Sequence, residues 1–296
     1  MTIEILKIED ATPRSRRVAI GTFDGVHLGH RKVIEGSDAV LTFDPHPLVV
    51  IHPDAAPKLL TPLALKAKIL DQLGVQELVL IDFNERFAHL EAEDFVREIL
   101  IGRLGATHVS VGENFRFGFK AKGDPEFLSR FAEFETNVVP LVEHGDEIVS
   151  STQIRGLVAA GDVHRADELL GYPFTMIGTV AHGDKRGREL GFPTANLVPG
   201  EHDCVPGHGV YAAFTDGVAS AVNVGVRPTF VTGRGLLVES FLIDWSGDLY
   251  GRQLEIAFLE RLRGERRYDT VAALVEQMDR DVAQARETCA RVLSQT

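Results

Sequence analysis

Hydrophobic residues follow two different patterns along the chain. Through about the first 170 residues, short apolar runs alternate with segments of helical spacing. The runs are rich in Val, Ile and Leu and are bounded by glycine, proline or polar residues, which is the pattern of buried strands. They lie at residues 17–22, 40–43, 78–81 and 108–111.

Helices are predicted between these strands. Leu65, Ile69 and Leu73 share one helical face, and Gly74 ends that pattern. Residues 92–103 form a second amphipathic segment, with Phe95, Ile99 and Leu100 facing inward. The alternation predicts an α/β, Rossmann-like domain with a parallel sheet, helices on both faces, and ligands at the carboxyl ends of the strands.

After Gly171 the helical pattern gives way to strand alternation. Strands are expected at residues 176–180, 209–214, 219–225, 236–244 and 253–259. A long final helix is expected over residues 269–292, with an apolar stripe made of Val271, Leu274, Val275, Met278 and Val282. This second pattern predicts a small antiparallel β-barrel domain with a C-terminal helix, so the domains are expected at residues 1–171 and 172–296.

Composition narrows the class of protein. A length of 296 residues fits two domains, and 44% hydrophobic with 25% charged residues is typical of a globular protein with real cores. The formal charge of −12 argues against nonspecific binding to nucleic acid or to an anionic membrane. Cys204 and Cys289 form neither a metal-ligand pattern nor a disulfide framework, and no signal peptide or membrane span is expected. We therefore expect a reduced, cytoplasmic compartment.

The stretch 183–196 carries the densest candidate chemistry. Gly183, Gly187 and Gly191 allow close backbone approach to a ligand, and three cations lie among them: Lys185, Arg186 and Arg188. Pro193 stiffens the chain just before Thr194 and Asn196, whose oxygens suit a Mg²⁺-nucleotide. The alternative is a solvated basic loop between two strands.

A second candidate follows the first strand. Gly21, Asp24 and Gly29 surround His27 and His30, which lie three residues apart and would share one side of a helical turn. Two imidazoles there can donate hydrogen bonds to phosphate oxygens, although such a pair is more often metal-binding or merely exposed. Only eleven residues separate His30 from Thr42, so the first helix is expected to have about two turns and to end near Gly36.

Two further segments contain groups that suit a ligand. Asn114 and Phe117 lie in a turn that could stack a planar ring and fix its polar edge, unless its aromatic residues belong to the core. Ser151, Thr152 and Arg155 open a helix, where cap donors and an arginine can reach one anion; a simple capped helix is the alternative.

Several of these motifs resemble those of one enzyme family. Gly187-Arg188 and the run 190–196 resemble the riboflavin kinase signature. The residues Phe23-Asp24-Gly25-Val26-His27-Leu28-Gly29-His30 and the run 150–155 resemble the two nucleotidyltransferase signatures. Together with the turn 112–118, they resemble the bifunctional bacterial riboflavin kinase/FMN adenylyltransferase (FAD synthetase) family over about residues 18–286.

The resemblance implies roles for individual residues. Thr194 and Asn196 would hold Mg²⁺-ATP, and His27, His30, Ser151, Thr152 and Arg155 would stabilise charge on the ATP phosphates. Asn114 and Phe117 would contact the flavin, and the family-like segment 223–229 could line the kinase site. Glu239 would be the base that takes the ribityl hydroxyl proton, whereas its position in a strand would equally suit a carboxylate turned outward.

The implied activity is flavin-cofactor synthesis. ATP would phosphorylate riboflavin to FMN in the second domain, and the first, nucleotidyltransferase-like domain would adenylate FMN to FAD with release of pyrophosphate, with Mg²⁺ bound. Two alternatives stay open: a riboflavin kinase whose N-terminal domain is degenerate, suggested by the short first helix, and a non-catalytic flavin-binding protein. The sequence carries no signal for the oligomeric state.

Overall fold

The structure is a computed structural model that describes residues 2–181, 192–226 and 236–295, with the side chains of Val226 and Leu236 left out. The chain forms two compact units, Met1–Ser151 and Thr152–Thr296. Helices α7 (Ser151–Ala160) and α8 (Val163–Leu170) thus fall almost wholly in the second unit, whereas the sequence analysis grouped them with the first domain. The boundary between functional domains near Gly171 stays a prediction.

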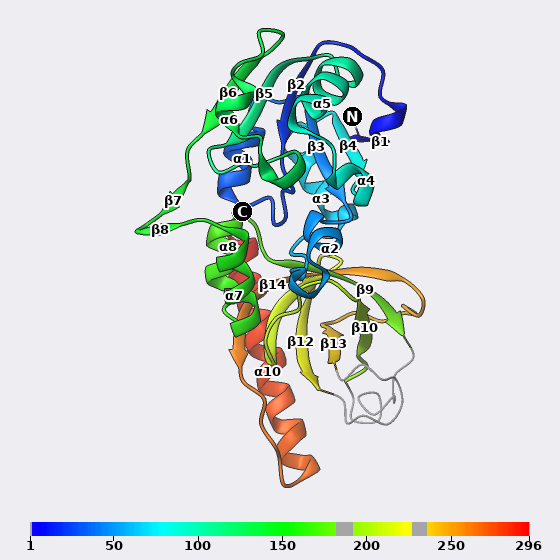
Figure 1. Cartoon of the computed structure of the whole chain (residues 1–296). Coiled ribbons are helices and arrows are strands. Elements are labelled where there is room, and N and C mark those ends of the chain that lie inside the picture. The colour runs from blue at the N-terminus through cyan, green and yellow to red at the C-terminus, as the bar shows by residue number, and fades with distance from the viewer. Residues whose placement is uncertain (1, 182–191, 227–235, 296) are drawn as a thin grey trace. The chain divides into compact units, whose positions relative to one another are not determined.

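The first unit is built on the expected parallel sheet (Figure 1). Its strands are β1 (Glu4–Lys7), β2 (Arg16–Ile20), β3 (Ala39–Asp44), β4 (Glu77–Asp82), β5 (Ala106–Gly112) and β6 (Glu135–Val139). They lie in the order β1-β4-β3-β2-β5-β6, and every neighbouring pair is parallel. The chain moves outward from β2 through β3 to β4 and then returns to the other side of β2. The topological switch point, where such sheets bind ligands, is therefore between β2 and β5.

Short helices connect these strands. They are α1 (Leu28–Ile34), α2 (Pro47–Ile51), α3 (Leu63–Gln72), α4 (Glu85–Ala88), α5 (Ala92–Asp94), the π-helix η3 (Phe95–Arg103) and α6 (Pro125–Leu128). Three 3₁₀ turns, η1 (Ile8–Asp10), η2 (Pro53–Ala55) and η4 (Phe119–Ala121), and the hairpin β7 (Glu143–His144)–β8 (Glu147–Ile148) complete the unit. Helix α1 has the predicted two turns, and Gly36 follows it at φ 73°.

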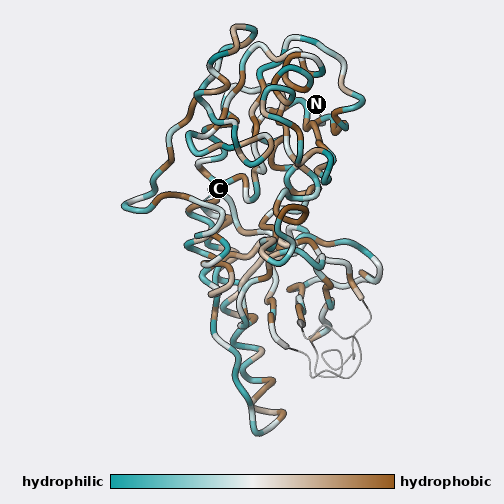
Figure 2. The backbone as a smooth tube through the Cα atoms, in the orientation of Figure 1, coloured by the Kyte–Doolittle hydropathy of each residue, from teal (hydrophilic) through white to brown (hydrophobic). Residues whose placement is uncertain are grey.

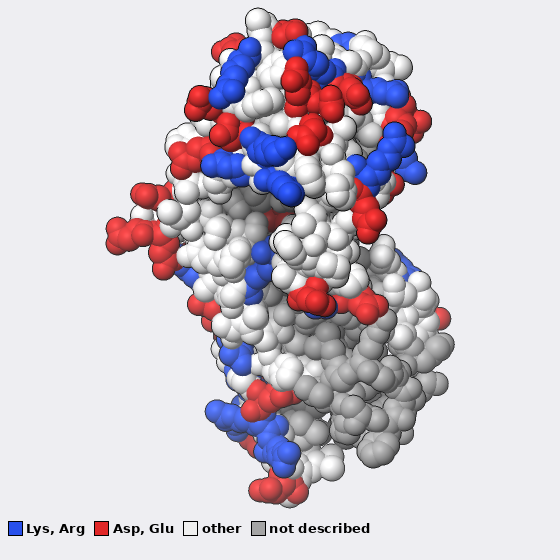
Figure 3. All heavy atoms as spheres, in the orientation of Figure 1, with Lys and Arg blue, Asp and Glu red and all other residues white. Residues whose placement is uncertain are grey.

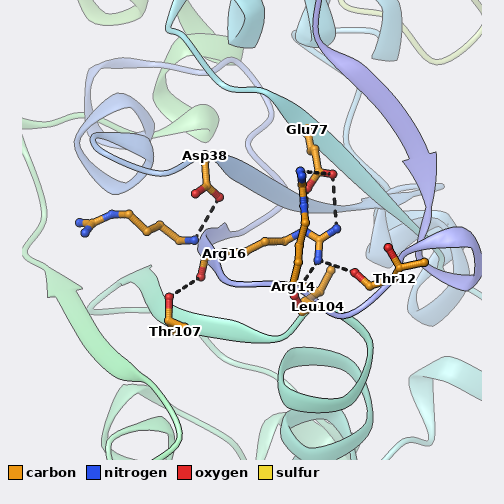
Figure 4. Close-up of polar contacts among 8 residues, drawn as sticks. Thr12, Arg14, Arg16, Asp38, Glu77, Leu104 and Thr107 are labelled. Carbon is orange, nitrogen blue, oxygen red and sulfur yellow. Dashed lines mark hydrogen bonds and ion pairs between the residues drawn. The ribbon is translucent and has the colours of Figure 1, made fainter.

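A buried ion pair closes the amino-terminal edge of this sheet (Figure 4). Arg16 begins β2 and Glu77 begins β4; the Arg16 Nε donates to Glu77 Oε2 at 2.6 Å, and both residues are at most 5% exposed. Arg16 Nη1 also donates to the carbonyl of Leu104, and Arg14 reaches the same carboxylate. Because the charges are fully paired at the edge opposite the ligand-binding ends, this network has a structural role.

The second unit is the expected antiparallel barrel (Figure 1). Its strands are β9 (Thr175–Ala181), β10 (Ala195–Pro199), β11 (Gly209–Thr215), β12 (Val218–Val226), β13 (Leu236–Leu242) and β14 (Gln253–Arg263), closed in the order β10-β13-β12-β11-β14-β9. Strand β10 was not predicted, because its five residues show no clear alternation and end in proline. Asp162 caps α8, since its carboxylate accepts from the N–H of Arg165.

The C-terminal helix α10 (Val271–Leu293) is present, and of the predicted stripe only Val271 is exposed, at 63%, whereas Leu274, Val275, Met278 and Val282 are half-buried. The fully buried residues lie further along the helix and are Asp281, Ala285, Thr288 and Cys289. The helix packs through Ala285 onto small residues of β11 and β12, and Asp281 forms an ion pair with Arg263 of β14. A carboxylate that is paired with a cation can be buried although it is not hydrophobic. Figure 2 accordingly shows hydrophilic and hydrophobic residues mixed along this helix.

Asp167 of α8 makes the stability of the second unit depend on pH. Its carboxylate accepts from the N–H of Phe174 at 2.6 Å, and burial raises its pKa to about 8. The protonated form is therefore favoured by folding, so this contribution to stability is complete below the unfolded-state pKa near 4 and is lost as the pH rises through 8.

We expect Asp167→Asn to keep the hydrogen bond and remove this dependence. The free energy of unfolding in urea should exceed that of the wild type by about 1–3 kcal/mol at pH 8 and by much less at pH 5. Asp162→Asn, at the exposed cap of the same helix, is the matched control. An equal effect of Asp167→Asn at both pH values would contradict the assignment.

Candidate functional site

The loop between β2 and α1, residues 21–27, lies at the switch point of the parallel sheet and has an unusual backbone. Phe23 and Val26 have φ values of 46° and 37°, and Gly25 has 97°. A bulky or β-branched residue in this region is strained, at a cost of about 1–3 kcal/mol for each residue. Such strain persists only where surrounding contacts hold it, and it is frequent at functional sites. We call residues 21–27 the nucleotide loop, after the nucleotide contact that the sequence predicts for it.

The two predicted histidines lie together at the end of this loop. The His27 and His30 rings are stacked, with centroids 3.5 Å apart, and Phe23 meets His30 edge-on at 5.3 Å. His27 caps α1, because its Nδ1 accepts from the N–H of His30 at 3.3 Å. An accepting Nδ1 carries no proton, so the hydrogen of the neutral His27 ring is on Nε2. The expectation that both imidazoles share one side is confirmed.

The small and acidic residues in and beside the loop have close contacts within the protein. A Cβ at Gly29 would lie 3.2 Å from the His27 ring, and one at Gly21 would lie 3.1 Å from the Phe23 ring. Asp24 is 1% exposed, and its Oδ1 accepts from the N–H groups of Leu60 and Thr61. These residues shape the loop from inside, and their predicted contact with a nucleotide stays a prediction.

The second signature meets the first within the first unit. The hydroxyl of Ser151 donates to the carbonyl of Asp24 at 2.7 Å, although 127 positions separate the two residues in the sequence. Thr152 and Arg155 follow on α7, in the second unit. The tertiary structure thus joins the two predicted phosphate motifs through Ser151.

The turn after β5 holds one exposed polar group and a row of aromatic rings. Asn114 is exposed, whereas Phe117 is 7% exposed and packs against Phe95 and Phe127 in the core. Phe115, half-buried, stacks on Phe117 at 5.5 Å and is the ring of this pair that keeps partial access to solvent. Phe117 thus belongs to the hydrophobic core, which was the alternative given for the aromatic residues of this turn. The flavin contacts of Asn114 and Phe117 stay predictions.

A row of polar side chains crosses three strands of the barrel. Glu239 of β13 lies directly opposite Asn196 of β10 on one side and Asn223 of β12 on the other. Cross-strand partners have Cβ atoms about 4.5–5.5 Å apart and point to the same face. The residues directly before and after each member of the row, such as Val238 and Ser240 around Glu239, are buried and belong to the opposite, inner face of the barrel. The row therefore lies on the outer face.

Glu239 is turned outward, as the alternative interpretation of its strand held, but all three side chains of the row are half-buried rather than fully exposed. Its role as the base stays a prediction. Asn223 was not chosen as a site residue from the sequence, although its segment was noted as family-like; only the strand register places it beside Glu239. The predicted ligand Thr194 is half-buried two residues before Asn196, next to Phe192, which packs edge-on against Phe241.

The remaining predicted nucleotide contacts, Gly183, Lys185, Arg186, Gly187 and Arg188, lie outside the described residues. Within the described ranges, no group of three or more His, Cys, Asp or Glu side chains could hold a metal ion, and no helix is long and apolar enough to cross a membrane. On the face in Figure 3, Lys and Arg are interspersed with Asp and Glu.

Taken with the fold, the two candidate sites, one on the parallel sheet and another on the barrel, fit a transferase. The FAD synthetase family model matches residues 9–153, and the riboflavin kinase family model matches residues 170–289. The chain belongs to the bifunctional riboflavin kinase/FMN adenylyltransferase family.

Relatives with that name resemble the chain over nearly its whole length. The protein of Listeria monocytogenes is 36% identical over 96% of both chains, that of Bacillus subtilis 39% over 90% of both, and that of Escherichia coli K12 36% over 91% of both. A crystal structure described as a macrolide-efflux protein from Streptococcus pneumoniae is also similar, with a TM-score of 0.86, 31% identity, and coverage of 96% of this chain and 99% of that chain.

Proposed function

We propose that each of the two reactions has its own site, FMN adenylylation on the parallel sheet and riboflavin phosphorylation on the barrel. The chain is a bifunctional riboflavin kinase and FMN adenylyltransferase, with riboflavin, FMN and ATP as its small-molecule substrates. The observation that carries the division of labour is that the stacked histidines and the Glu239 row lie in different compact units, each matched by a different family model.

On the barrel, Glu239 would act as the general base. Its carboxylate would accept the proton of the terminal ribityl hydroxyl as that oxygen attacks the γ-phosphorus of ATP, which leaves FMN and ADP. Asn196 and Asn223 lie opposite Glu239 on the two neighbouring strands. Their amides would orient the carboxylate or the incoming hydroxyl.

On the parallel sheet, no protein nucleophile is needed. A phosphate oxygen of FMN would attack the α-phosphorus of ATP, and the bond to the leaving pyrophosphate would break. The Nε2–H of His27 and the adjacent imidazole of His30 would donate to the oxygens on which negative charge increases. Ser151 would hold the loop through its bond to Asp24. Phosphate binding by Thr152 and Arg155, which begin the second unit, stays a prediction.

The donor set on the barrel fits Mg²⁺ rather than a softer metal. Thr194 and Asn196 offer a hydroxyl and an amide oxygen, with the Glu239 carboxylate in the neighbouring strand. Mg²⁺ prefers a few protein oxygens together with substrate phosphates, and when bound it would neutralise charge on the ATP phosphates. The use of ATP and the two buried cysteine thiols, Cys204 and Cys289, further suit a cytoplasmic location.

The alternative of a riboflavin kinase with a degenerate first domain is not favoured, because the FAD synthetase family model matches that part of the chain and the histidine pair is intact. The test is a time course of purified protein with riboflavin, ATP and Mg²⁺, in which riboflavin, FMN and FAD are quantified by chromatography. We expect FMN to appear first and FAD to follow with release of pyrophosphate. FMN without FAD would support the kinase-only alternative, and no turnover would support the non-catalytic one.

Removal of divalent cations should stop both reactions. We expect excess EDTA to lower FMN and FAD formation by at least about tenfold each, and added Mg²⁺ to restore them. Thr194→Val should raise the Mg²⁺ concentration needed for FMN formation and leave the requirement of FMN adenylylation unchanged. A rate of FMN formation that is insensitive to EDTA would contradict the metal assignment.

A further inference from the structure

The nucleotide loop is held from outside by residues 60–66, which we call the loop brace. These residues precede and open helix α3 and contain none of the predicted ligand-binding groups. Two of their polar side chains, those of Thr61 and Lys66, are 2% and 8% exposed. A buried hydroxyl and a buried ammonium lower stability unless each is bonded, so their contacts indicate what they do.

Thr61 binds the loop through both its backbone and its side chain. Its Oγ1 accepts from the N–H of Gly25 at 2.7 Å and lies 3.3 Å from Asp24 Oδ1, to which it can donate. The N–H groups of Leu60 and Thr61 donate to that same Asp24 oxygen at 2.9 and 3.0 Å. One threonine thus fixes the two residues at the centre of the loop.

Lys66 binds the beginning of the loop. Its Nζ donates to the carbonyl of Thr22 at 2.7 Å, an oxygen that also accepts from the hydroxyl of Thr42. Burial lowers the pKa of Lys66, while the nearby carboxylates of Asp24 and Asp44 act in the opposite direction because they favour the charged ammonium. A methionine of similar length would fill this space without the cost of desolvation, so packing alone does not explain a lysine here.

The brace acts on the strained part of the chain. Thr22 directly precedes Phe23 and Gly25 directly precedes Val26, the two non-glycine residues of this loop that are held at positive φ. His27 follows directly, so the position of its ring depends on this backbone. Since the Lys66 ammonium is bonded to a carbonyl and almost excluded from solvent, it acts through the loop rather than by touching a substrate.

We propose that Thr61 and Lys66 are positioning residues for FMN adenylylation, which hold the nucleotide loop in its strained conformation and thereby aim the His27 and His30 imidazoles. The inference rests on the adenylylation proposed for the first unit. It predicts that loss of either contact slows FAD formation without unfolding the protein and without changing FMN formation.

The first experiment compares Thr61→Val with Thr61→Ser in the full chain. Valine keeps the shape and removes the hydroxyl, whereas serine keeps the hydroxyl. We expect Thr61→Val to lower the kcat of FMN adenylylation by about 10-fold to 100-fold, with a smaller change in the KM for ATP, because a displaced catalytic group costs rate more than binding. Thr61→Ser should stay near the wild type, and the rate of FMN formation should be unchanged in both variants.

The second experiment uses Lys66→Met and separates positioning from stability. Because the substitution removes a desolvated charge, the thermal unfolding midpoint should be unchanged or higher, while the kcat of adenylylation should fall by about 10-fold or more. A purely structural lysine would give the opposite pairing, a lower midpoint and adenylylation that recovers on cooling.

The outcomes distinguish this inference from the proposed function. If the wild type makes no FAD from FMN, the proposed adenylylation fails. If the wild type makes FAD and both Thr61→Val and Lys66→Met retain its rate, only the inference is overturned. The inference is also overturned if the loss of FAD formation in each variant is fully explained by the fraction of that variant that is unfolded. Should Thr61→Val fail to fold, Lys66→Met decides.

Discussion

Glu239→Gln should abolish phosphorylation of riboflavin and spare the adenylylation of supplied FMN. Glutamine preserves the size of the side chain and its place between Asn196 and Asn223, but its amide cannot accept the hydroxyl proton. Loss of a general base typically costs about 10²–10⁴-fold in rate, so FMN formation should fall by about 10³-fold. The measurement is the initial rate of FMN formation from riboflavin, beside that of FAD formation from FMN, in one preparation.

The matched control for this variant is Glu255→Gln. Glu255 is also a half-buried strand carboxylate of the barrel, on β14, and lies outside the row of Glu239. Its substitution should leave both rates near those of the wild type. If Glu239→Gln forms FMN normally, the row on the outer face of the barrel is not the phosphoryl-transfer site.

His30→Ala should have the reverse effect. The His30 ring stacks on His27, so its removal takes away one donor and also frees the other ring to move. Removal of one preorganised donor costs about 10²–10³-fold, and we expect the rate of FAD formation from FMN to fall by at least that much. FMN formation from riboflavin should not change, because the barrel is a separate compact unit.

His108→Ala provides the comparison within the first unit. His108 lies near the start of β5, away from the nucleotide loop, and its contact with Glu135 is with an exposed side chain. The His108→Ala substitution should leave the rates of both reactions unchanged. Loss of both reactions in a folded His30→Ala protein would mean that the two sites are not independent and would overturn the division of labour.

The sequence predicted the architecture wherever a single segment carries its own signal. Short apolar runs gave the central strands β2 to β5, and the eleven residues between His30 and Thr42 limited α1 to two turns. The helix caps Asp162 of α8 and Thr270 of α10 are local features of the same kind, because a cap acts on the residues directly after it. The family signatures supplied the activity, since they are contiguous runs.

The sequence did not predict features that depend on which segments pair. Strand β10 is too short and irregular to be recognised alone, and without it no register sets Asn196 opposite Glu239. The loop brace gave no signal either, because Thr61 and Lys66 look like ordinary residues at the start of a helix. The buried face of α10 was missed at Asp281, whose burial depends on Arg263 from another strand.

From its own residues, then, the chain determined two domain types, and its resemblance to a known family implied the two reactions, because hydrophobic period and contiguous motifs are local properties. Only the tertiary structure decided that Asn223 and Asn196 flank Glu239, that Ser151 meets Asp24, and that a buried lysine holds a strained loop. The physical reason is that each of these arrangements joins groups distant in sequence, and their contact is fixed by strand register and packing rather than by any local preference.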